Sequence, residues 1–101
     1  MAFSANLDLL PQVEGKRLVL LDGAGAEVAV ITNAPGTAGS FRVYAYLAAK
    51  YGAINANAAQ KGLEIYADHT DDARLNPGKH PNIDRLLDCI GAGRIYAVEI
   101  L

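Results

Sequence analysis

The sequence predicts a single α+β domain spanning residues 1–101, with a three-stranded, mainly antiparallel sheet and helices packed on one face. Strand-like segments occupy 16–22, 27–32 and 94–101, and turn residues 22–25 join the first two into a hairpin. Helical periodicity falls outside these strands, giving the order α-β-β-α-α-α-β. Such segregation of strands from helices is typical of α+β rather than alternating α/β proteins.

The central strand is predicted from four consecutive apolar residues at 18–21. A continuous apolar run indicates burial on both faces, so we place 16–22 between its hairpin partner and the C-terminal strand. Helices on one face would leave the other face open. Either the N-terminal helix or a second copy of the protein is expected to cover it.

Four helices are predicted from apolar residues that repeat every three or four positions. They span 4–10, 41–51, about 55–75 and 82–90. Ser4, Asn55 and Asn82 are expected to cap three of them, and Gly52 to end the second. Gly62 lies inside the third helix, where glycine weakens a helix by about 1 kcal/mol relative to alanine.

Composition excludes several classes of protein. The chain has 101 residues, of which 51% are hydrophobic and 20% charged, and a net charge of −2. Because its nine basic residues are scattered, we expect no binding of nucleic acid. No apolar run is long enough to span a membrane, and the N-terminus lacks the pattern of a signal peptide, so a cytoplasmic protein is expected.

The first candidate site is the loop 33–40, which carries two glycines between a strand and a helix. Free amides at the start of a helix attract anions. The loop matches no phosphate-binding fingerprint, and a turn with a helix cap at Thr37 or Ser40 explains it better. Its candidate ligand-binding residues are Gly36, Thr37, Gly39, Ser40 and the nearby Arg42.

The second candidate site is the loop 76–84, which holds two prolines, a glycine and a histidine. Prolines restrict the backbone here, so the loop is either a rigid polar surface or a stop-and-restart signal between helices. Its candidate ligand-binding residues are Lys79, His80 and Asn82.

Metal binding and catalysis find little support. Residues 68–72 combine a histidine with three aspartates, but a solvated acidic helix face explains them better than a metal site. Neither serine lies in a nucleophile motif, and Cys89 falls on an apolar helix face that indicates burial. We therefore assign no catalytic residue, metal or cofactor.

The segment Asn76-Pro77-Gly78-Lys79-His80-Pro81-Asn82-Ile83-Asp84, followed by Leu86-Leu87, resembles the signature of a family of short uncharacterised bacterial proteins. The loop 33–40 is similar to that family too, so the resemblance covers nearly the whole chain. It implies a free-standing bacterial domain of unknown function. It carries over no activity and no site residue.

Two functions remain open. The first is a non-enzymatic domain that acts by self-association or by binding another protein, most simply as a homodimer. An open apolar sheet face and unprotected sheet edges favour it. The second is a small-molecule or anion-binding protein, or an enzyme, that uses the loop 33–40 or the loop around His80. A pocket joining the two loops would favour the second.

Overall fold

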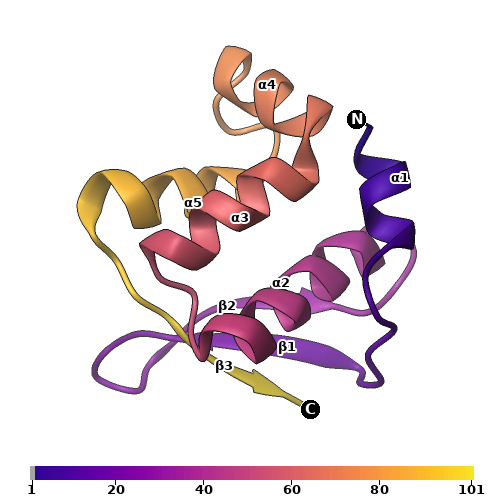
Figure 1. The fold of residues 1–101 in the computed structure, drawn as a ribbon. Coiled ribbons are helices and arrows are strands. Elements are labelled where there is room, and N and C mark those ends of the chain that lie inside the picture. Colours follow the sequence, from indigo (N-terminus) through magenta and orange to yellow (C-terminus); the bar gives the residue numbers. More distant parts are fainter. Residues whose placement is uncertain (1) are drawn as a thin grey trace.

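The computed structural model describes residues 2–101, and within them it contains five helices and three strands (Figure 1). The elements are α1 (Phe3–Asp8), β1 (Arg17–Leu21), β2 (Glu27–Thr32), α2 (Ala38–Tyr51), α3 (Ala56–Tyr66), α4 (Asp68–Leu75), α5 (Pro81–Ala92) and β3 (Ala97–Ile100). The predicted α+β class is confirmed.

The three strands form one antiparallel sheet in the order β2-β1-β3. The predicted hairpin and the central position of β1 are therefore confirmed. The carboxylate of Asp22 shapes the hairpin turn, because its Oδ1 accepts hydrogen bonds from the amides of Ala24 (2.9 Å) and Ala26 (3.0 Å). Gly25 completes the turn with a φ of 82°, a conformation that glycine adopts without strain.

The helices lie on one face of the sheet in successive layers (Figure 1). α2 packs against all three strands, and α3 packs on both α2 and α5. α4 lies farthest from the sheet, while α1 lies beside α2 and α3. Side chains that are fully buried between these layers form the core, among them Leu18, Leu20, Ile31, Phe41, Tyr44, Leu47, Ile83 and Leu86.

The predicted helix over about 55–75 is divided into α3 and α4. The break is at Ala67, which has φ 50° and ψ −112°, a conformation that side-chain-bearing residues rarely adopt. Thr70 braces the corner, because its buried hydroxyl donates to the carbonyl of Leu63 (2.6 Å). The corner turns the chain so that α4 lies on the far side of α3 from the sheet (Figure 1), with Asp68 at its start next to α1.

The predicted helix caps have mixed outcomes. Asn55 does cap α3, with its Oδ1 accepting from the amide of Ala58 (2.9 Å), and Gly52 ends α2 in the left-handed conformation. The caps predicted at Ser4 and Asn82 are wrong. Ser4 lies inside α1, and Asn82 lies inside α5, because Pro81 occupies the first turn of that helix, where its missing N–H costs nothing.

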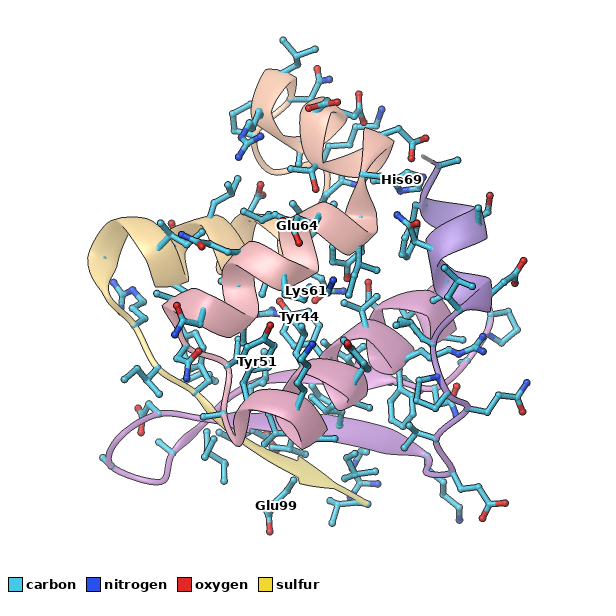
Figure 2. The ribbon with its side chains drawn as sticks, viewed as in Figure 1. Tyr44, Tyr51, Lys61, Glu64, His69 and Glu99 are labelled. Carbon is cyan, nitrogen blue, oxygen red and sulfur yellow. The ribbon has the colours of Figure 1, made fainter. Side chains whose placement is uncertain are left out.

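The outer face of the sheet is not covered by α1 or by any other described element (Figure 1). Val28 and Val30 on this face are 46% and 44% exposed. Glu99 points away from the helices on the same side (Figure 2). The expectation that α1 covers this face is therefore wrong. None of the helices formed by residues 2–101 is long and apolar enough to cross a membrane.

Candidate functional site

The two candidate loops meet in one pocket. Its volume is about 420 Å³, within the range of small-molecule sites. The start of α2 and the start of α5 form two of its sides, although the loops are some forty residues apart in sequence. The lining residues are Phe3, Gly36, Thr37, Gly39, Ser40, Tyr66, His69, Lys79, His80, Pro81, Asn82 and Ile83.

The loop 76–84 folds back onto α4. The Nε2 atom of His80 lies 2.6 Å from Oδ2 of Asp72, and Nζ of Lys79 lies 3.0 Å from the same oxygen. The amide of Gly78 donates to Asp84 (2.9 Å), which closes the loop on itself. These contacts fix His80 and Lys79 at the rim of the pocket.

The carboxylate of Asp72 is held in its charged form by these partners. The hydrogen bond with His80 and then that with Lys79 lower the pKa of Asp72 to about 2. A carboxylate that orients one nitrogen of a histidine leaves the other ring nitrogen available to a ligand. His80 is therefore positioned by Asp72 much as a histidine is positioned in a binding or catalytic site.

The loop 33–40 is held by a side-chain hydrogen bond that is not a helix cap. Thr37 does not cap α2 with its side chain; its hydroxyl donates to the carbonyl of Thr32 (2.6 Å). Ser40, in the first turn of α2, accepts a hydrogen bond from the Tyr66 hydroxyl (2.6 Å). Burial raises the pKa of Tyr66 to about 12, so the phenol keeps its proton and remains a donor at neutral pH.

A row of four rings crosses the pocket. Phe3 lies between Tyr66 and His69, with ring centroids 4.8 Å and 5.0 Å away, and His69 lies 5.7 Å from His80. Figure 2 shows His69 beside the first turn of α1. The amide of Phe3 donates to Asp68 (2.9 Å), which holds α1 against α4.

The chemistry of the lining favours anions over cations. Lys79 and two histidines line the pocket, but no aspartate or glutamate does. The nearest carboxylates, Asp68 and Asp72, already accept hydrogen bonds from Phe3, Lys79 and His80. Across residues 2–101, no three or more His, Cys, Asp or Glu side chains are grouped so as to hold a metal ion.

Seven of the eight residues singled out from the sequence line this pocket: Gly36, Thr37, Gly39, Ser40, Lys79, His80 and Asn82. Arg42 does not. Its guanidinium donates to the carbonyls of Leu10 (2.7 Å) and Pro11 (3.3 Å), beside a smaller pocket of about 260 Å³. Arg42 thus holds the segment that follows α1, and of the other seven residues only Gly39 also lines this smaller pocket.

The sequence does not predict the row of rings. Its pattern indicates only apolar helix residues at Phe3 and Tyr66 and an acidic helix face around His69, and no sequence signal places the three together. Their meeting depends on the corner at Ala67 and on the position of α1, both of which are tertiary features.

Cys89 lies apart from the site, in the core. It is fully buried, and burial raises the pKa of its thiol, so it is present as the neutral thiol at physiological pH. This agrees with the structural role predicted for it.

The molecule is a small α+β domain with one ring-lined, carboxylate-free pocket formed by two distant loops. Its residues 3–100 match the model of a family described as uncharacterized proteins conserved in bacteria (DUF2322), and the chain belongs to that family. The resemblance drawn from the loops is thus confirmed, and the function of the family is unknown. Searches of curated proteins and of solved structures found no match.

Proposed function

We propose that this protein binds a small anionic molecule in the pocket between the loops 33–40 and 76–84. The observation that carries the proposal is the convergence of Ser40, Lys79 and His80 on one cavity without any carboxylate in its lining. Binding sites commonly combine an apolar cavity with a few convergent polar groups. Both loops then serve a ligand rather than acting as separate turns.

The proposal is tested by nuclear magnetic resonance titration of the ¹⁵N-labelled protein with inorganic phosphate, acetate and phenyl phosphate, each added separately. At least one anion is expected to shift amide signals in both loops. Lys79→Gln should weaken that response, whereas Lys50→Gln, on the exposed end of α2, should not. If no anion shifts both loops, the proposal is wrong.

A second function is supported by the uncovered face of the sheet. We propose that two copies associate through this face, since Val28 and Val30 are exposed there beside Val19, which is buried but lies outside the helix-covered core. Closed two-fold dimers are the commonest protein oligomers.

We also propose that the protein is located in the bacterial cytoplasm. Its single cysteine is free, as is usual for cysteines in that reducing compartment.

Sedimentation velocity at micromolar concentrations tests self-association. The wild-type protein is expected to sediment as a dimer, and the double variant Val28→Glu, Val30→Lys as a folded monomer. Glu64→Lys, on an exposed position of α3, is the control for a change of charge elsewhere and should remain dimeric. A monomeric wild-type protein would contradict the proposal and leave the pocket proposal untouched.

A further inference from the structure

The residues that line the pocket are of two chemical kinds, and together they narrow the class of ligand. Four of them form the row of rings, Tyr66, Phe3, His69 and His80, which we call the ring wall. Three others, Ser40, Lys79 and Asn82, carry hydrogen-bond donors, and we call them the polar wall. A ligand that uses both walls needs a flat apolar part and an acceptor-rich part.

The donors of the polar wall keep hydrogens that the protein does not use. Ser40 accepts from Tyr66, and within residues 2–101 its own hydroxyl hydrogen has no acceptor. Asn82 accepts from Arg85 through Oδ1 (2.8 Å), which leaves its Nδ2 hydrogens without a partner in the same residues. Lys79 has one close contact, with Asp72, and three hydrogens to donate. These groups call for an acceptor, and an oxyanion is the strongest available.

The ring wall has room for another ring. Phe3 is only partly buried and His69 is exposed, so both have surface that no described side chain covers. Consecutive rings are tilted by 39°, 60° and 50° rather than stacked flat. A planar guest can therefore meet both faces and edges, the arrangements that aromatic pairs prefer.

We propose that the ligand is an aromatic anion: a planar ring that carries a phosphate or carboxylate group. This inference rests on the proposed function and adds the class of ligand. The acidic oxygens bind Ser40, Lys79 and Asn82, while the ring packs against Phe3 and His69. His80, held by Asp72, lies where the two walls meet.

The test compares the affinities of phenyl phosphate, inorganic phosphate and the neutral benzyl alcohol for the full chain, measured by the same amide shifts. Phenyl phosphate is expected to bind about tenfold more tightly than inorganic phosphate, since an aromatic contact contributes up to roughly 1.5 kcal/mol. It is also expected to bind more tightly than benzyl alcohol, which has the ring but no charged oxygens for Lys79. The affinities of benzoate and acetate are compared in the same way, to test whether a ring also increases the affinity of a carboxylate. An aromatic advantage in either the phosphate pair or the carboxylate pair supports the inference.

Two variants separate the walls. Phe3→Leu keeps an apolar side chain but removes the ring, so it should abolish most of the preference for phenyl phosphate over inorganic phosphate. Leu9→Ala, at the exposed far end of the same segment, is its control. Lys79→Gln should weaken the binding of phenyl phosphate and of inorganic phosphate and leave the ratio of the two affinities unchanged.

The outcomes distinguish this inference from the proposed function. If phenyl phosphate and benzoate bind no more tightly than inorganic phosphate and acetate, the aromatic class is wrong while anion binding stands. If benzyl alcohol binds as tightly as phenyl phosphate, the anionic class is wrong. If no probe shifts both loops, the pocket proposal itself fails. The comparison of ligands on the wild-type protein needs no variant to fold.

Discussion

Gly62 lies where α3 comes closest to its neighbours. A methyl group added there would lie 2.6 Å from Cδ1 of Leu86 and 2.9 Å from Cδ1 of Leu47, both fully buried. The sequence predicts only that this glycine weakens its helix. In the structure it permits the close contact of α3 with α5 and α2.

Gly62→Ala is expected to lower the free energy of unfolding by about 1 kcal/mol. Overpacking a core costs roughly 1–3 kcal/mol, while replacing a helical glycine returns about 1 kcal/mol. Chemical denaturation measures the change. Gly91→Ala in α5, where nothing lies within 4 Å, is the control and should stabilise the protein. If both variants are equally stabilising, close packing at Gly62 is not the reason for the glycine.

The lowered pKa of Asp72 leads us to expect that the free energy of unfolding depends on pH. Its pKa is about 2 in the folded protein, because His80 and Lys79 stabilise the carboxylate, and about 4 in the unfolded chain. The folded state therefore gains stability from this group above about pH 4. That gain is lost as the pH falls from about 4 through about 2, and below both pKa values Asp72 is protonated in the folded and the unfolded state.

The prediction is checked by thermal unfolding of the wild type and Asp72→Asn between pH 2 and 7. The variant should be less stable at neutral pH, and the difference in melting temperature should shrink between about pH 4 and 2. Asp71→Asn, an exposed neighbour on α4, should show no such convergence. A difference that is constant with pH would contradict the role of the ion pair.

At the scale of elements, the sequence pattern predicts the features that depend on interactions between residues close together in the chain. The hairpin, the cap at Asn55 and the end of α2 at Gly52 depend on residues adjacent in sequence. The corner at Ala67 does not. Alanine favours helix, and no glycine or proline marks the break, so periodicity alone continues the helix through it. The corner is held by the bond from Thr70 to Leu63 across it and by the long-range bond from Phe3 of α1 to Asp68.

Ala67→Gly is expected to stabilise the protein by about 1 kcal/mol. A side chain in a sparsely populated backbone region costs roughly 1–3 kcal/mol, and the substitution removes this strain from the folded state. The greater freedom of glycine in the unfolded chain offsets about 0.4–1 kcal/mol of that gain. Ala49→Gly, at an exposed helical position of α2, should destabilise by about 1 kcal/mol. Denaturant unfolding compares the two. A destabilising Ala67→Gly would contradict strain at this corner.

At the scale of the whole molecule, the sequence predicted the loops of the candidate site but not its walls. The glycines and prolines of the loops 33–40 and 76–84 identify both as loops from the sequence alone, without knowledge of where they lie in the fold. Their meeting depends on how α2 and α5 pack, and the ring wall depends on α1 and α4. Arg42 is close to the first loop in sequence but points to the other side of α2, toward Leu10.

Tyr44 connects the two sides of the pocket. It is fully buried in α2, and its hydroxyl donates to the carbonyl of Asn82 at the start of α5. Arg85 donates to the same hydroxyl (3.2 Å) and to Oδ1 of Asn82 (2.8 Å). Burial raises the pKa of Tyr44 further above its usual value, so the donor persists at all physiological pH values.

Tyr44→Phe removes this connection while keeping the ring. It removes one hydrogen bond from the carbonyl of Asn82, which still accepts from the backbone of the next turn of α5, so the cost is about 0.5–1.5 kcal/mol. We expect the free energy of unfolding to fall by that amount and amide hydrogen exchange to rise at 79–84, because the start of α5 loses its attachment to α2. Tyr51→Phe, at the half-buried end of α2, is the matched control and should change neither. Unchanged exchange at 79–84 in Tyr44→Phe would mean that packing of Ile83 and Leu86 alone holds the two loops together.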